Sequence, residues 1–209
     1  MRSTVEITVA PTVTRLTTLQ RVKEELSIEG SASDGILGAK IDEATSDIEA
    51  HLARTLSRAT VTQTLWNVGY SEYILLRRYP VASIVSVTVD DIAVDSDEYR
   101  LDGDSGILYR LDASGYPCAW WSCKSIVVVY AGGYLLPGET NRNLPPALES
   151  AAVDLVSSYW SSRGRDATVK AEDVPGLGRV EYWVGAVGES GELPPSVVTK
   201  ISPFRRPSA

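Results

Sequence analysis

The chain has 209 residues, a hydrophobic fraction of 44% and a net charge of −7, so we expect one large or two small globular domains and exclude a disordered chain. No apolar run approaches the roughly 20 residues that a membrane span needs, and the N-terminus lacks the apolar core of a signal peptide, so we expect a protein made and kept in the cytoplasm. The acidic balance argues against tight nucleic-acid binding, because such binding needs basic side chains to replace counterions on phosphates.

The first quarter of the chain predicts an extension followed by two helices. Residues 1–15 are expected to be extended and loosely held. The first helix runs from about Thr18 to Ser27, where Thr17 or Thr18 can cap it. The second runs from about Ile36 to Thr55, with Ser33 or Asp34 as its cap. Its apolar residues recur on one face at helical spacing: Leu37, Ile41, Ala44, Ile48 and Leu52.

The period changes to that of strands between residues 59 and 134. Short β-branched and aromatic runs are separated by clusters of Asp, Asn, Gly and Pro. In one of these runs Val85, Val87 and Val89 alternate with Ser86 and Thr88, which is typical of a half-buried antiparallel strand. The sequence therefore predicts an antiparallel β-rich module inserted between helical elements.

A third helix is predicted from 144 to 162, because Pro145 and Pro146 suit a first turn and apolar pairs recur every four residues after them. Residues 163–209 are predicted to form an extended arm with a turn before a short aromatic strand, and with a short helix that Pro194 and Pro195 begin. The fold class is thus α+β: an antiparallel helical bundle (16–56 and 144–162), the inserted module 59–134, and the C-terminal arm.

Candidate catalytic and metal-binding residues are few. His51 is the only histidine, and no nucleophile motif accompanies it. Cys118 and Cys123 can form a disulfide, but beside Trp120 and Trp121 in a reducing compartment they suit core filling better. No string matches a phosphate-binding loop. The five tryptophans can stack on sugars or bases, although at strand and helix positions core or interface roles are commoner. We therefore predict no catalytic residue, no metal and no cofactor.

The densest charge cluster is acidic and lies in the β module. Its members are Asp90, Asp91, Asp95, Asp97, Glu98, Asp102 and Asp104. The stretch from Asp102 to Gly106 resembles the start of a calcium-binding loop, but Gly106 and Ala113 stand where such a loop needs acidic ligands. Hairpin turns between strands are the favoured interpretation, because Asp and Gly are common turn residues.

The order of these elements and several local strings resemble the head–tail connector (adaptor) proteins of tailed bacteriophages and gene-transfer particles. The matching strings span most of the chain; the departures are residues 1–15 and the segment CAWWSC. The strings are LTTLQRVKEELSI, DGILGAKIDEATSDIEAHLART, TQTLW, LRRYPVASIVSVTVD, EYRLDGDSGILYRL, IVVVYAGGY, LPPALESAAVDLVSSYWSSRGRD, VPGLGRVEYW and LPPSVVTKISPFRRP.

The resemblance implies a structural virion protein without enzymatic activity. It implies a homo-oligomeric ring, commonly of twelve subunits, which sits under the portal protein in the neck of the virion after assembly in the host cytoplasm. Such a ring extends the DNA channel, through which DNA passes without specific binding. It also offers a platform to the next tail component, a stopper or a tail tube terminator. No membrane is involved.

Partner contacts are predicted in the C-terminal arm, where the chain is expected to leave its own core. The predicted interface residues are Arg163, Arg165, Tyr182, Trp183, Phe204, Arg205 and Arg206. An alternative for the last segment is that Val197, Val198 and Ile201 pack on the same subunit. Two other functions stay open: another virion component, such as a stopper or tail-completion protein, and a small hydrolase or carbohydrate-binding module built on the β module.

Overall fold

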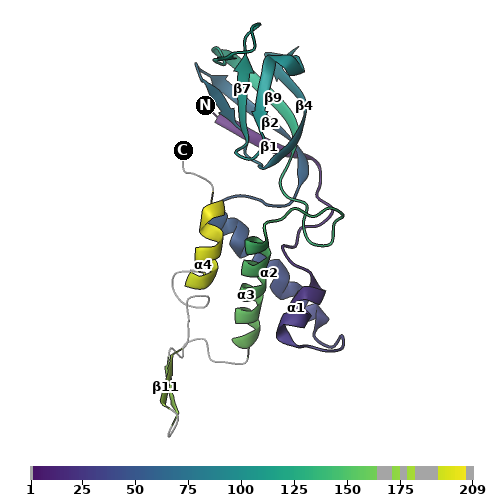
Figure 1. Cartoon of the computed structure of the whole chain (residues 1–209), viewed down its shortest axis with the longest axis vertical. Helices are drawn as coiled ribbons and strands as arrows, with labels where there is room; N and C mark the ends of the chain where they lie inside the picture. Colours follow the sequence, from purple (N-terminus) through teal and green to yellow (C-terminus); the bar gives the residue numbers. More distant parts are fainter. Residues whose placement is uncertain (1, 164–170, 175–177, 182–192, 206–209) are drawn as a thin grey trace. The chain divides into compact units, whose positions relative to one another are not determined.

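The computed structural model describes residues 2–163, 171–174, 178–181 and 193–205 (Figure 1). It contains helices and antiparallel sheets, so the α+β class predicted from the sequence is confirmed. The chain divides into two compact units. We call Met1–Thr14 with Arg54–Asn143 the β unit, and Arg15–Ala53 with Leu144–Ala209 the helical unit.

The β unit contains two antiparallel sheets. The larger sheet has the strand order β1-β2-β9-β4-β5, and the smaller has the order β3-β7-β6 with β8 paired to β7. A short 3-10 helix, η1 (Ser96–Glu98), precedes β6. The strands are β1 (Arg2–Val9), β2 (Ala59–Val68), β3 (Tyr73–Leu75), β4 (Val81–Val89), β5 (Ile92–Ala93), β6 (Tyr99–Asp102), β7 (Ile107–Leu111), β8 (Pro117–Cys118) and β9 (Cys123–Gly132).

The N-terminal residues differ from the sequence prediction. Residues 1–15 were expected to be a loosely held extension, but residues 2–9 form β1, which pairs antiparallel with β2 at the edge of the larger sheet. The physical reason is the polar–apolar alternation from Thr4 to Val9 (TVEITV), which suits a strand once a neighbouring strand supplies the hydrogen-bond partners. The strand stays largely exposed, with Ile7 at 58% and Val9 at 59% of their full accessibility.

Strand β4 also corrects the sequence prediction. Val87 is buried as expected, but Val85 is 66% exposed. The register between β4 and β9 shifts between Ile84 and Ser86, so one residue is left out of the pairing. Such a bulge moves the following side chains to the opposite face of the strand. Val85 is the residue left out of the pairing and points to solvent, while Ile84, just before it, is half-buried against the core.

The core of the β unit holds a buried polar network as well as apolar side chains. The Arg78 guanidinium donates to the Ser57 carbonyl oxygen (Nε to O, 3.0 Å), and Arg78 is only 8% exposed. The backbone N–H of Arg78 donates to the Tyr130 hydroxyl at 3.1 Å, and this hydroxyl donates to Gln63 Oε1 at 2.9 Å. Buried polar groups that are hydrogen-bonded in this way fix one arrangement of the strands.

Two glycines lie where the chain leaves β9 and approaches this network. A methyl group on Gly132 would overlap the carbonyl oxygen of Arg78, and one on Gly133 would overlap that of Ser57. Gly133 also has a φ of +103°, which favours glycine. The close backbone approach therefore requires residues without a side chain at both positions.

The helical unit contains four α-helices: α1 (Leu19–Leu26), α2 (Asp34–Leu52), α3 (Pro146–Ser161) and α4 (Pro195–Ile201). The Thr18 side chain caps α1, as predicted, by accepting from the backbone N–H of Arg21 at 3.2 Å. All five residues predicted on the apolar face of α2 are fully buried. A strand pair, β10 (Ala171–Val174) and β11 (Gly178–Glu181), follows α3. No helix among the described residues is long and apolar enough to cross a membrane.

Helix α3 contacts each of the other three helices. Its apolar stripe is buried, including Leu148, Leu155 and Val156 at 0% exposure. The Tyr159 hydroxyl donates to the Asp47 carboxylate on α2 at 2.6 Å. Burial, and then this hydrogen bond to a carboxylate, raise the pKa of Tyr159 well above its usual value. The phenol therefore stays neutral and holds α3 against α2.

Candidate interaction surfaces

Three of the seven predicted interface residues lie within the described structure. Arg163, just after α3, is exposed and places its guanidinium 3.9 Å from the centre of the Trp160 ring. Phe204 is half-buried in the 3-10 helix η2 (Ser202–Phe204), and Arg205 is exposed after it. Arg165, Tyr182, Trp183 and Arg206 lie outside the described residues. The role of all seven in binding partners stays a prediction.

The residues just before Phe204 are used inside the helical unit. Val197 is 1% exposed and Ile201 is fully buried, and α4 packs on α3. Lys200 Nζ donates to Ser150 Oγ at 2.9 Å and forms an ion pair with the Asp154 carboxylate. The alternative that this segment packs on its own subunit is therefore confirmed for α4. We therefore restrict the docking prediction for this segment to the residues from Ser202 onward.

The acidic cluster of the β module forms turns, as the favoured interpretation expected. Asp90 and Asp91 make the two-residue turn between β4 and β5 with φ values of 48° and 67°, the turn geometry that joins hairpin strands. Asp95 and Glu98 cap η1. Asp102 accepts from Ser105 Oγ at 2.5 Å, and this contact lowers the pKa of Asp102. Among the described residues no cluster of three potential metal ligands occurs.

A groove of about 700 Å³ lies beside the turn between β4 and β5. It includes both cysteines, which are half-buried free thiols. Burial, and then the charge of Asp90, raise the pKa of Cys123, which disfavours a reactive thiolate. Trp120 fills the core and donates to the Leu108 carbonyl oxygen at 3.2 Å, whereas Trp121 is 72% exposed. The prediction of core filling concerned the two cysteines, and both are half-buried; of the tryptophans, predicted to have core or interface roles, Trp120 lies in the core and Trp121 on the surface.

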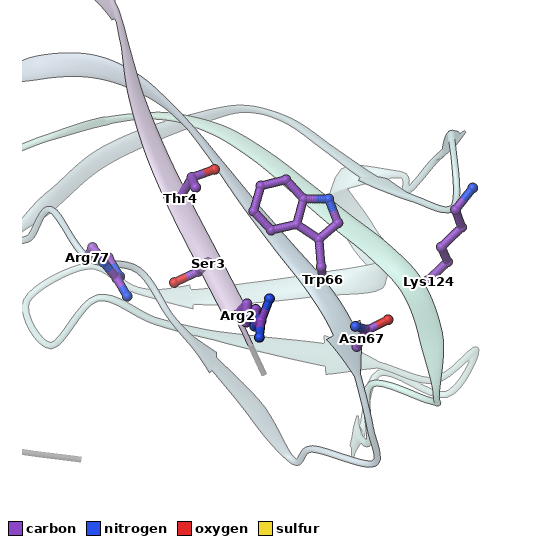
Figure 2. A pocket seen from close by; sticks show the side chains of 7 residues that line it. All are labelled: Arg2, Ser3, Thr4, Trp66, Asn67, Arg77 and Lys124. Carbon is purple, nitrogen blue, oxygen red and sulfur yellow. The ribbon is translucent and has the colours of Figure 1, made fainter.

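A second cavity, of about 770 Å³, lies at the other edge of the larger sheet and is strongly basic. We call it the basic pocket; it is lined by Arg2, Ser3, Thr4, Trp66, Asn67, Arg77 and Lys124 (Figure 2). Trp66 on β2 lies between Arg2 on β1 and Lys124 on β9, and this residue is 39% exposed. Three cationic side chains and no acidic one line this part of the described structure.

The folded core positions one side of the basic pocket. The backbone N–H of Arg77 donates to Gln63 Oε1 at 2.8 Å, and Gln63 Nε2 donates to the Leu75 carbonyl oxygen at 3.0 Å. Gln63 is only 1% exposed. The amide therefore fixes residues 75–77 against β2 and holds the Arg77 backbone in place while its side chain reaches the surface.

Sequence reasoning missed the basic pocket. Its residues are spread from Arg2 to Lys124 and meet only because β1, β2 and β9 are neighbours in one sheet. One signal was available: in the alternating run ATVTQTLW, Trp66 falls on the same face as Thr62 and Thr64, which is opposite to Val61 and Leu65. Aromatic residues are enriched at interfaces, so a tryptophan on the polar face of a strand is a candidate contact residue.

His51, the residue considered for a catalytic role, is half-buried on α2 and lines neither of the two cavities just described. The pKa of Asp42 is lowered by its hydrogen bonds to Arg15, which is a contact within the helical unit and not a cleft.

Taken as a class, the fold is a two-unit α+β protein with a helical unit and a β unit that carries charged edges. Residues 16–94, which include α1, α2 and the strands β2 to β5, match the family model described as the phage gp6-like head-tail connector protein. Comparison with curated protein sequences found no match.

Solved structures share the fold over almost the whole chain. A chain from the neck of an empty gene transfer agent (GTA) particle computed with C6 symmetry is 17% identical, with a TM-score of 0.60 over 99% of this chain and 97% of that one. A chain from the virion of a native GTA particle is 16% identical, with a TM-score of 0.62 over 98% of this chain and 96% of that one. A chain from the neck of a native GTA particle computed with C12 symmetry is 17% identical, with a TM-score of 0.59 over 99% of this chain and 97% of that one.

The resemblance seen in the sequence is therefore confirmed by the match to the family model. A connector family model matches residues 16–94, and at this low identity the solved structures establish a common fold.

Proposed function

We infer that the protein is a structural head–tail connector (adaptor) of a tailed bacteriophage or gene-transfer particle. The observation that carries this conclusion is the match of residues 16–94 to a head–tail connector family. The fold supports it over the whole length, because the similar chains come from particle necks and a virion. A structural connector needs surfaces for partners and no active site, which suits the exposed charged and aromatic surfaces of the β unit.

We propose that the subunits form a ring of twelve under the portal protein. The C12 symmetry used for one neck with the same fold supports this number. In this arrangement the ring extends the DNA channel and offers a platform to a stopper or tail tube terminator. The net charge of −7 favours passage over retention, because a wall that attracted phosphates strongly would slow DNA. The site of action is the virion neck, reached by assembly in the host cytoplasm.

We propose further that the end of the chain docks on the portal. Phe204 offers an aromatic side chain, and Arg205 follows it on an exposed segment. Aromatic and arginine residues are the commonest anchors of protein interfaces. Arg206 extends the same basic segment, and Arg163, Arg165, Tyr182 and Trp183 are proposed as further contacts.

The test is binding of the full-length chain to purified portal protein, followed by native mass measurement. We expect a complex with twelve copies, and we expect Phe204→Ala with Arg205→Glu to weaken portal binding at least about tenfold, the scale of a lost interface anchor. Arg100→Glu on β6 is the matched control, because it changes an exposed arginine of the β unit. Unchanged binding of the Phe204 variant would reject the docking site, and no binding by the wild type would reject the connector role.

The runner-up function is another neck component, such as a stopper or tail-completion protein. The same experiment separates the two, because a stopper would bind only to a portal that already carries a connector ring. Direct binding to the bare portal favours the connector.

A further inference from the structure

The two lateral edges of the larger sheet carry opposite charge. The basic pocket spans β1, β2 and β9 and contributes Arg2 on the edge strand β1, Arg77, and Lys124 on the central strand β9. The other edge, formed by the β4–β5 turn and the segment after β5, carries four exposed acids, which we call the acidic edge: Asp90, Asp91, Asp95 and Asp97. A heterologous ring contact needs two different complementary surfaces on each subunit, and these edges are such a pair.

The two charged edges also lie at the same end of the sheet. Arg2 pairs with Trp66, and Trp66 pairs with Ser125 on β9. Ser125 in turn meets Asp90: its N–H donates to Asp90 Oδ1 at 2.8 Å, and the Asp90 N–H donates to the Ser125 carbonyl oxygen at 3.0 Å. One row across the sheet thus begins at Arg2 in the basic pocket and ends at Asp90 on the acidic edge, and about 14 Å separates these two residues at ordinary strand spacing.

We propose that the basic pocket of one subunit receives the acidic edge of the next copy of this chain. Neighbours related by rotation about a ring axis present the β1 edge of one copy to the β5 edge of the next. Because Arg2 and Asp90 lie on one row across the sheet, placing two copies side by side brings Arg2 and Lys124 of one copy to the same level along the strand direction as Asp90 and Asp91 of the next. The inference deepens the proposed ring and rests on it.

A second copy suits this pocket better than nucleic acid does. The chain is acidic overall, which repels phosphate at a distance. The acidic edge, in contrast, is present once for every basic pocket, so each contact in a closed ring is satisfied. Trp66 adds an exposed ring that can be covered in the contact, and aromatic residues are enriched at such interfaces.

The test uses charge reversal in the full-length chain assembled with portal protein. We expect Arg2→Glu with Lys124→Glu to raise the concentration for half-maximal ring assembly about tenfold, since attraction becomes repulsion at each contact. Asp91→Asn with Asp97→Lys should weaken assembly in the same way. An equal mixture of the two variants should assemble better than either alone, because in an alternating ring half of the contacts pair an unchanged pocket with an unchanged edge and the other half pair a changed pocket with a changed edge. Combining all four changes in one chain should restore assembly in part. Arg100→Glu is the matched control.

Two further measurements keep the outcome clear. Thermal unfolding of each variant checks that the exposed substitutions leave the fold intact, and wild-type ring assembly is followed against salt, where we expect weakening as screening increases. Normal assembly of the Arg2/Lys124 variant, or salt-independent assembly of the wild type, would overturn the acid–base contact and leave the connector ring standing. Normal assembly with lost DNA retention would assign the pocket to nucleic acid instead. Failure of the wild type to form any ring would overturn the contact together with the ring.

Discussion

The β unit and the helical unit place their polar side chains in different positions. In the helical unit the apolar faces of α2 and α3 form the core, and ion pairs such as Arg15–Asp42 lie near the surface. In the β unit Arg78 and Gln63 lie inside and hydrogen-bond to the backbone. Buried polar groups are costly when they lose a partner, whereas exposed pairs contribute little. The β unit should therefore be the more sensitive of the two to single changes.

The largest effect is expected at the glycine beside the Arg78 backbone. Gly132→Ala places a methyl group against the Arg78 carbonyl oxygen, and β9 or the segment between β3 and β4 that carries Arg78 must shift to make room. We expect the free energy of unfolding to fall by about 3 kcal/mol or more. Denaturant unfolding followed by tryptophan fluorescence measures this loss. Gly69→Ala is the control, because open space surrounds that position; equal losses in the two variants would contradict the close approach.

An intermediate effect is expected at Gln63. In Gln63→Leu the Arg77 N–H and the Leu75 carbonyl oxygen lose their partner inside the protein. We expect a loss of about 2 kcal/mol in the free energy of unfolding, the scale for unsatisfied buried groups. Gln20→Leu in α1 is the matched change in the helical unit, where the amide bonds the exposed Glu24 carboxylate. A comparable loss from both would remove the distinction between the units.

The smallest effect is expected at Asp42, which accepts two hydrogen bonds of 2.7 Å from the Arg15 guanidinium. Asp42→Asn should cost about 0.2–1 kcal/mol at neutral pH, because the pair is largely exposed. The guanidinium lowers the pKa of Asp42 in the folded protein. The stabilisation is therefore present above the pKa of the unfolded chain and disappears as pH falls through the folded value.

The measurement is the free energy of unfolding of both proteins between neutral and acidic pH. The difference between wild type and Asp42→Asn should shrink toward zero in acid. A difference that stays constant across this range would show that the ion pair is not its source.

Helical periodicity made the helical unit predictable. The face from Leu37 to Leu52 repeats at helical spacing, so the buried side of α2 could be predicted without knowing its neighbours. The start of α2 was placed within two residues. Helix α4 was predicted, but the choice between docking and self-packing was not, since it depends on a distant partner, Asp154.

The β unit was predicted in class but not in detail, because its features depend on register. Alternation alone placed Val85 inside, and only the bulge in β4 turns it outward. Strand β1 was missed because its partner β2 is more than 50 residues away in sequence. The basic pocket depends on both pairings of β2, so no local pattern could assemble Arg2, Trp66 and Lys124.

The division of the chain has a consequence for how the protein withstands cleavage. The chain passes between the units three times, after Thr14, Ala53 and Asn143. A single protease cut at any one passage would leave the units covalently joined by the other two. The proposed connector would thus keep its two units linked after one such break.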